Sequence, residues 1–198
     1  MIARTIAPLL SGKIEPIYHF CFAPWDRSIP WDTRIAKLPK EETAMAHRWQ
    51  MRLQSLNQVS YYLDGSQMPK STGIGVGLAG YKCASRPFIR LARNIGPHQI
   101  VYNGELEGVA LACEDATKLG PNRDIRVYVD NQAAIYRLAR PSDNPGQIQQ
   151  IRAVAAATKI AQNGSTLAIE WVPGHQDIDG NEEADKLAKL GSKSLLTT

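Results

Sequence analysis

The sequence has no long hydrophobic run and few cysteines, and both shortages exclude classes of protein. No segment of its 198 residues approaches the roughly 20 uninterrupted apolar residues that span a bilayer, and the apolar run near the N-terminus is too short for a secretory signal. The three cysteines form no C-x-x-C pair, which argues against a disulfide framework and a zinc knuckle. We therefore expect a soluble, intracellular protein of the cytoplasm or nucleus. An organelle-targeting segment, with Arg4 and Lys13 before the first acidic residue, stays open as an alternative.

A strong excess of either charge is also missing, because the formal net charge is only +4. Residues 1–58 hold 8 of the 23 basic and 5 of the 19 acidic side chains, so most of the excess lies in that part. Any binding of nucleic acid by the later residues must therefore depend on local patches. One candidate patch for phosphate contacts, with a solvated strand face as the alternative, consists of Lys82, Arg86, Arg90 and Arg93.

Residues 1–57 lack the regular patterning of the rest of the chain. Prolines interrupt them repeatedly, which predicts a connector or N-terminal extension. Over residues 40–56 a helical pattern begins, with Met45, Trp49 and Leu53 spaced four apart. We expect one short helix here that packs on a neighbour through this apolar face.

From residue 59 onward, strands and helices follow in a legible order. The order β-β-β-α-β-α-α-β-α predicts an α/β fold whose mixed five-stranded sheet, three antiparallel strands and then two parallel ones, is flanked by helices. We therefore expect one domain over residues 58–193 and a tail at 194–198, with residues 1–55 dispensable for folding. The expected strands cover 59–66, 72–80, 86–95, 124–131 and 166–175, and the expected helices cover 101–120, 131–141, 145–165 and 180–193.

Two of the apolar strands end in an aspartate, Asp64 and Asp130. The C-terminal end of a central strand lies at the edge of the sheet where open α/β folds collect their sites. Each residue has an alternative role when taken alone. Asp64 precedes a glycine, a common turn pair, and Asp130 could cap the next helix by bonding the amide near Ala133.

Two further acids fall on expected helices. Glu105 lies in the first turn of its helix, one position before the apolar stripe residue Leu106, so it should lean toward the sheet. The alternative is simple pairing with the helix dipole. Asp185 lies four residues before Lys189, where a surface ion pair is the alternative.

Taken together, four acids from two strands and two helices would rarely meet at one edge by accident. Clustered carboxylates repel one another unless a cation lies between them, and hard oxygen ligands suit Mg²⁺ or Mn²⁺. Two such ions can activate a water on one side of a phosphodiester and stabilise the leaving oxygen on the other. The pattern therefore predicts a metal-dependent nuclease.

Four pieces of the sequence resemble the type 1 ribonuclease H family, in family order: YYLDGS, NGELEGVALA, YVDNQAA and WVPGHQDIDGNEEADKLA. They cover about residues 59–193, and the narrower resemblance is to the RNase H domain that follows the reverse transcriptase of fungal non-LTR retrotransposons. The resemblance implies an endoribonuclease that hydrolyses the RNA strand of RNA–DNA hybrids and leaves 5′-phosphate and 3′-hydroxyl ends. It also implies two Mg²⁺ ions as cofactors, with Mn²⁺ as a substitute. The implied partners are the hybrid and the reverse transcriptase portion of a longer polyprotein, without a membrane.

The same resemblance assigns roles to individual residues. As catalytic residues that bind metal it implies Asp64, Glu105, Asp130 and Asp185, and as the mobile catalytic histidine beside them it implies His175. As substrate-binding residues it implies Gly65, Ser66, Asn103, Gln132 and Asn181.

The sequence departs from the best-known cellular members at one point. Only SDNP separates two of the expected helices, which leaves no room for the basic helical protrusion that grips the hybrid in those enzymes. Two other functions stay open: a decayed, non-catalytic scaffold, and a DNA nuclease of the same superfold. Over residues 73–77 alternate glycines predict a strand whose bare backbone lets a neighbour or a nucleic-acid strand approach.

Overall fold

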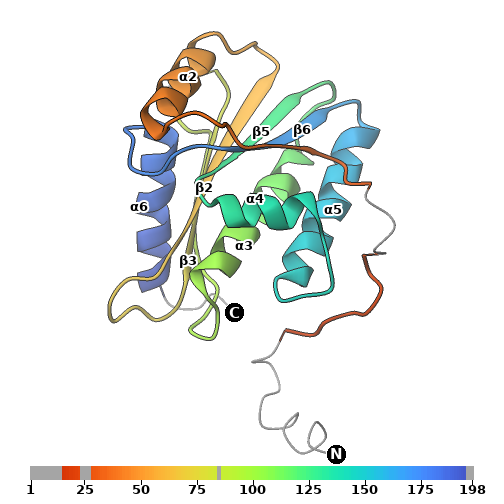
Figure 1. The fold of residues 1–198 in the computed structure, drawn as a ribbon, viewed down its shortest axis with the longest axis vertical. Coiled ribbons are helices and arrows are strands. Elements are labelled where there is room, and N and C mark those ends of the chain that lie inside the picture. The colour runs from red at the N-terminus through yellow and green to blue at the C-terminus, as the bar shows by residue number, and fades with distance from the viewer. Residues whose placement is uncertain (1–14, 23–27, 84–85, 195–198) are drawn as a thin grey trace, which may run out of the picture.

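A mixed sheet forms the centre of the molecule (Figure 1). The computed structural model describes residues 15–22, 28–83 and 86–194. The strand order is β1-β6-β5-β2-β3-β4, with β2, β3 and β4 antiparallel and β2, β5, β6 and β1 parallel. The strands are β1 (Asp32–Arg34), β2 (Gln58–Ser66), β3 (Gly75–Tyr81), β4 (Ile89–Asn94), β5 (Asp124–Val129) and β6 (Thr166–Trp171). The predicted α/β class and strand pairing are confirmed, but the predicted count of five strands is wrong because β1 adds a sixth.

Helices cover both faces of this sheet (Figure 1). One face packs against the helices α3, α4 and α5, and the other against α2 and α6. Within the described residues no helix is both long and apolar enough to cross a membrane. The helices are α2 (Lys40–Arg52), α3 (Val101–Ala116), α4 (Gln132–Ala139), α5 (Gln147–Gln162) and α6 (Asp179–Lys193).

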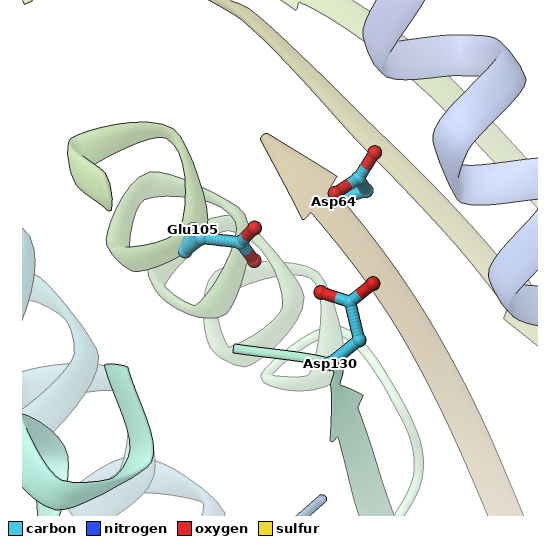
Figure 2. A group of neighbouring side chains, drawn as sticks. All are labelled: Asp64, Glu105 and Asp130. Atoms are coloured by element: carbon cyan, nitrogen blue, oxygen red, sulfur yellow. The ribbon is translucent and has the colours of Figure 1, made fainter. Parts of the chain in front are cut away.

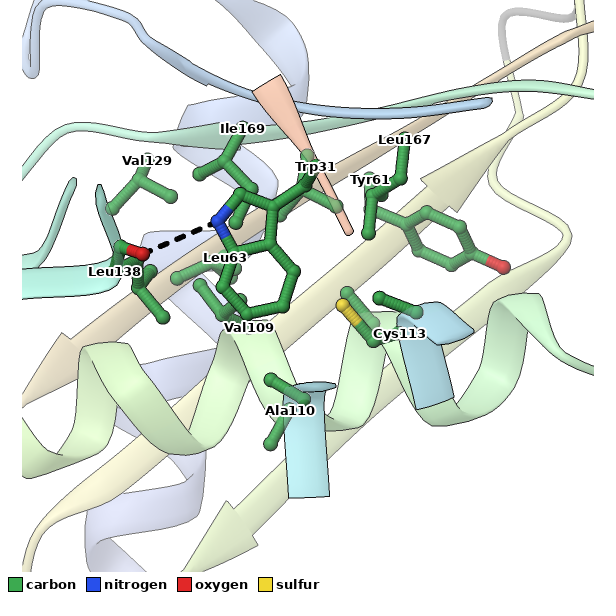
Figure 3. Packing of buried hydrophobic residues seen from close by; sticks show 14 of the residues in the cluster. Trp31, Tyr61, Leu63, Val109, Ala110, Cys113, Val129, Leu138, Leu167 and Ile169 are labelled. Carbon is green, nitrogen blue, oxygen red and sulfur yellow. Dashed lines mark hydrogen bonds between the residues drawn. The ribbon is translucent and has the colours of Figure 1, made fainter. Parts of the chain in front are cut away.

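Trp31 brings the segment before the predicted domain into the main core (Figure 3). Its side chain is 5% exposed, packs among residues of the sheet, α3 and α4, and donates a hydrogen bond from Nε1 to the carbonyl of Leu138 at 3.3 Å. The next residues form β1, in which Asp32 pairs with Ala168 of β6. Residues 28–34 are therefore part of the packed fold, and whether residues 1–55 are dispensable for folding stays a prediction for experiment. Prolines did not prevent this, because an edge strand of three residues needs few backbone donors.

The helix α2 is present as predicted, but the face it buries is not the predicted one. Met45, Trp49 and Leu53 are 57%, 61% and 68% exposed, whereas Ala44 and His47 are buried. The reason is the polar aromatic surface beneath the helix. There His47 Nε2 lies 2.8 Å from the hydroxyl of Tyr62, and burial, together with the charge of Arg48, lowers the pKa of His47 to about 4. A neutral imidazole fits this surface better than a large apolar side chain.

The glycines of β3 allow α6 to lie directly on the sheet. A Cβ atom at Gly75 would come within 1.9 Å of the Ala188 carbonyl oxygen, and one at Gly77 within 2.0 Å of the Ala184 carbonyl oxygen. Any side chain at either position would push the helix away from the sheet. Of the two predicted uses of this bare backbone, the structure shows the approach of a neighbour, and the neighbour is the helix that carries Asp185.

Candidate active site

Three acidic side chains meet at one edge of the sheet (Figure 2). Asp64 lies near the end of β2, Asp130 directly follows β5, and Glu105 projects from α3. Parallel pairing of Leu63 with Val129 places the two aspartates on neighbouring strands at the same level. One ligand oxygen from each of the three acids lies within 4.8 Å of the other two. Register and helix packing therefore bring together residues that are far apart in the sequence.

The structure excludes the helix-capping alternative for Asp130. The cap of α4 is Asn131, whose Oδ1 accepts hydrogen bonds from the amides of Ala133 at 3.0 Å and Ala134 at 3.3 Å. Asn131 was missed in the sequence, although asparagine before a helix is a recognised capping signal. Because the neighbouring residue satisfies the helix, the carboxylate of Asp130 stays available to the cluster.

The position of Glu105 is not explained by pairing with the dipole of its helix. The helix α3 starts at Val101, so Glu105 lies beyond its first turn and not in it as predicted, and its exposed fraction is 3%. Oε1 accepts a hydrogen bond from the backbone amide of Gly65 at 3.2 Å. Oε2 is buried and has no hydrogen-bond partner within the described parts of the chain. A buried carboxylate oxygen without a donor requires a compensating group.

Asp185 belongs both to the cluster and to a surface pair. Its Oδ2 accepts a hydrogen bond from Lys189 Nζ at 2.5 Å, which is the ion pair considered for it from the sequence. After burial and the charge of Asp130, the charge of Asp185 also raises the pKa of Asp64, while the group of three mutually close acids does not include Asp185. The structure therefore places Asp185 beside Asp64, at the outer side of the cluster, with a cation on its far side.

Burial and mutual repulsion oppose ionisation of the three central acids. Burial, then the charges of Asp130 and Asp185, raise the pKa of Asp64 to about 7. Burial, then Asp64 and Asp130, hold the pKa of Glu105 well above its ordinary value. Burial also raises the pKa of Asp130. Closely spaced oxygens, an unpartnered Oε2 on Glu105 and uncompensated negative charge together fit a hard divalent cation such as Mg²⁺.

Two of the predicted residues contact or face Asp130 from the segment that follows β6. Asn181 is buried in the first turn of α6, and its side-chain amide offsets part of the rise that burial causes in the pKa of Asp130. His175 is exposed and faces the same carboxylate, whose pKa a protonated imidazole there would lower. Gly174, which lies between β6 and His175, was not predicted as a site residue. A Cβ atom there would lie 2.6 Å from Asp130 Oδ2. Asn181 thus supports Asp130 from inside, and His175 approaches it from solvent.

The remaining predicted substrate-binding residues lie around this edge and differ in burial and hydrogen bonding. Ser66 ends β2 and Gln132 begins α4, both half-buried. Asn103 is nearly buried, donates to Gln99 Oε1 at 2.6 Å, and keeps Oδ1 without a partner among the residues described. No contact in the structure tests their roles, which stay predictions.

The basic patch predicted on the antiparallel strands is largely paired. Arg90 forms an ion pair with Glu183 at 2.5 Å, and Arg93 forms one with Glu107 at 3.2 Å. Lys82 Nζ lies 4.3 Å from the ring centroid of Phe88. These contacts favour the solvated strand face over a patch free to bind phosphates.

The raised pKa of Asp64 predicts how stability depends on pH without metal. Its folded value of about 7 lies above its ordinary value of 3.8, so the folded protein binds this proton more tightly than the unfolded chain does. In EDTA, the contribution of Asp64 to the free energy of unfolding should be fully present below about pH 4 and should be lost as the pH rises through about 7. Thermal unfolding of wild type and D64N between pH 5 and 8 measures this. A decline equally steep in both proteins would contradict it.

The chain matches known proteins over the part that carries the site. The family model RNase H matches residues 56–193. The Pol polyprotein of caprine arthritis encephalitis virus (strain Cork) is 30% identical over 142 residues, which is 69% of this chain and 11% of that protein. The chain thus spans about a tenth of that relative's length. Whether fungal retrotransposon domains are closer relatives stays a prediction.

Solved structures share the fold at low sequence identity. RNase H1 from the halophilic archaeon Halobacterium salinarum NRC-1 superposes with a TM-score of 0.55 at 23% identity, over 68% of this chain and 96% of that one. LC11-RNase H1, solved in complex with an RNA/DNA hybrid, superposes with a TM-score of 0.54 at 16% identity, over 68% and 96% of the two chains. At these identities the likeness demonstrates the fold.

Proposed function

The chain belongs to the RNase H family, and we propose that it hydrolyses the RNA strand of RNA–DNA hybrids with two divalent metal ions, leaving 5′-phosphate and 3′-hydroxyl ends. The observation that carries the proposal is the cluster of Asp64, Glu105 and Asp130, whose ligand oxygens lie within 4.8 Å of one another. A family relative that had decayed into a scaffold would have no reason to keep three mutually repelling acids together. The hybrid bound by LC11-RNase H1 supports the choice of substrate.

Asp64, Glu105 and Asp130 would hold the ions, with Asp185 available from the side of Asp64. When bound, two Mg²⁺ ions, or Mn²⁺ in their place, would activate the attacking water and stabilise the leaving oxygen. The chain itself orients the ligands. The Gly65 amide holds one oxygen of Glu105, which leaves the other oxygen of that carboxylate for a cation.

Substrate recognition is assigned to the residues around this cluster. The sugar and phosphate groups of the hybrid would be contacted by Ser66, Asn103 and Gln132. Ser66 shares β2 with Asp64, Asn103 shares α3 with Glu105, and Gln132 starts the helix that follows Asp130. Hydroxyl and amide groups can distinguish the 2′-hydroxyls of RNA from DNA by hydrogen bonding. The oxygen of Asn103 that lacks a partner is a free acceptor for such a contact.

A cleavage assay tests the proposed function. The full chain is incubated with an end-labelled RNA–DNA hybrid, duplex DNA or duplex RNA, in Mg²⁺, Mn²⁺ or EDTA. We expect cleavage of the RNA strand of the hybrid alone, in either metal, and none in EDTA. Cleavage of duplex DNA would favour a DNA nuclease of the same superfold, and no cleavage in any metal would favour a non-catalytic scaffold.

His175→Ala is expected to slow turnover without abolishing it. His175 is exposed on the loop after β6, so its side chain can move between Asp130 and solvent and assist proton transfer or product departure. Positioned acid–base groups contribute about 10²–10⁴-fold, and because water can substitute here we expect a loss near or below 10²-fold. Single-turnover rates at saturating hybrid measure it. An unchanged rate would contradict the role, and complete inactivity with weakened metal binding would make His175 a ligand.

We further propose that the chain works beside a reverse transcriptase in a longer polypeptide. The support is the match to a Pol polyprotein of which the chain spans 11%. The exposed apolar row of Met45 and Trp49 on α2 and Leu53 just after it is compatible with a packed neighbour, since the described residues leave it uncovered. The cytoplasm and the nucleus are equally open as its location.

A further inference from the structure

The loop that carries His175 has a demanding backbone conformation. Residues 173–177 connect β6 to the residue that precedes α6. Within them His175 has φ 57° and Asp177 has φ 51°. Both values lie in the left-handed region, which costs a non-glycine residue about 1 kcal/mol or more and persists only where the surroundings maintain it. The contacts that maintain it therefore determine where His175 lies.

Both ends of this loop are held by the core. Val172, just before it, donates a backbone hydrogen bond to the carbonyl of Val129 at 3.0 Å. Ile178, just after it, is buried in the cluster that includes Ala44 of α2. These anchors fix the ends of the loop but not the two left-handed residues between them.

One side chain from α2 holds the middle of the loop. Arg48 donates from Nη1 to the backbone carbonyl of Gln176 at 2.8 Å, and Gln176 lies between His175 and Asp177. Over the described residues this is the one hydrogen bond that the structure records for loop residues 173–177. Arg48 and this hydrogen bond are exposed, which weakens the contact. A charged donor still makes a stronger hydrogen bond than a neutral one, so this contact helps to maintain the backbone conformation.

The space around Arg48 shows why a polar contact is needed. A cavity of about 460 Å³ lies between α2 and the start of α6. It is lined by Arg48 and Arg52 of α2, by Ile178 just before α6 and by Gly180 of α6. Side chains do not fill this space, so packing alone does not press the loop against the helix. Arg48 spans the gap, while its own helix is fixed by the contact of His47 with Tyr62.

We infer that Arg48 is a positioning residue of the nuclease: by holding the Gln176 carbonyl it keeps His175 beside Asp130. The preceding residue, Gly174, lies against Asp130, since a Cβ atom there would be 2.6 Å from Oδ2. The inference rests on the proposed function, because Arg48 acts through His175. It also gives a role in the reaction to the helix that precedes the predicted domain. A change in the placement of α2 would be transmitted to His175 through this hydrogen bond.

A double-mutant cycle on the full chain tests the inference. Single-turnover rates at saturating hybrid and KM are measured for wild type, R48M, H175A and the double variant. Methionine keeps the aliphatic stem of Arg48 and removes its donors. We expect R48M to lower the rate about 3- to 10-fold, part of the contribution of a positioned acid–base group, with KM nearly unchanged. In the H175A background the same substitution should have no further effect.

Two further variants separate positioning from general damage. R48K keeps a cationic donor and should recover most of the rate. R52M makes the same substitution one turn along α2, where the structure records no hydrogen bond or ion pair between Arg52 and another described residue, and should match wild type in rate and Tm. The Arg48 inference would be overturned if R48M slowed the wild-type and H175A proteins equally, or if R48K failed to restore the rate. Either result would leave the proposed function intact. An unchanged rate in H175A would overturn the proposed role of His175, and the Arg48 inference with it.

Discussion

Asp64→Asn and Asp130→Asn are each expected to abolish metal-dependent cleavage while leaving the protein folded. Asparagine keeps the size of the side chain and removes the charge that would hold the ions. Without that charge the site would not hold the ions, which would supply both the activated water and the stabilisation of the leaving oxygen, so the rate should fall to the background of the assay. Cleavage of labelled hybrid in Mg²⁺ measures activity, and near-UV circular dichroism with thermal unfolding measures the fold.

Stability gives this prediction a second readout. Asp64 and Asp130 repel each other, and burial raises the pKa of both, so removing one charge should raise Tm in EDTA at pH 8 or leave it unchanged. Asp32→Asn is a matched control, since it removes an exposed carboxylate of β1 whose pairing with Arg34 contributes little. The control should cleave as wild type does. Wild-type activity in D64N or D130N would contradict the proposal that these carboxylates form the active site.

Trp31→Ala is expected to destabilise the protein by about 3–5 kcal/mol, the usual cost of truncating a buried tryptophan. Trp31 is 5% exposed, and its removal also leaves the Leu138 carbonyl without a donor. For a chain of this size the loss corresponds to a Tm lower by roughly 10 °C. Trp49→Ala is the matched control, because that tryptophan is 61% exposed. It should change Tm little.

Deletion of residues 1–55 extends the same argument. It removes Trp31, β1 and α2 together, so it opens the main core and uncovers Tyr62 and Tyr128 on the other face of the sheet. We expect a chain that unfolds at a much lower temperature and without a sharp transition, measured by near-UV circular dichroism and calorimetry. A truncated chain as stable and cooperative as the full one would show that residues 58–193 suffice. We propose instead that the folding unit also includes residues 15–22 and 28–55, because Glu15 accepts hydrogen bonds from the amides of Gly146 and Ile148 and Trp31 lies in the main core.

The sequence alone predicted the main features of the fold because they depend on local patterns. Alternating apolar residues mark the strands, and an aspartate that ends a buried strand must lie at the edge of the sheet. The strand pattern was therefore sufficient to pair Asp64 with Asp130, and the place of Glu105 beside an apolar stripe was sufficient to add it. Their distances agree with that prediction, while their catalytic roles stay predictions.

The individual alternatives could not be decided from the sequence, because each depends on a neighbouring group. Capping of α4 by Asp130 was equally compatible with the sequence, and it is excluded because Asn131 occupies the cap. Asp185 could have been a pure surface ion pair, and it does bind Lys189, yet its charge also acts on Asp64. A single pattern allowed both contacts, and only the packing of α6 on the glycines of β3 determined which groups Asp185 would reach.

Residues 1–57 mark the boundary between what the sequence determined and what the tertiary structure decided. The spacing of Met45, Trp49 and Leu53 correctly predicts a helix, because helical periodicity is local. Which face that helix buries depends on the surface opposite, and a pair of stacked tyrosines there favours Ala44 and His47. Likewise, the contacts of Trp31 with Leu138 and of Arg48 with Gln176 join residues more than a hundred positions apart. Local periodicity carries no information about such contacts, since they form only once the whole chain has packed.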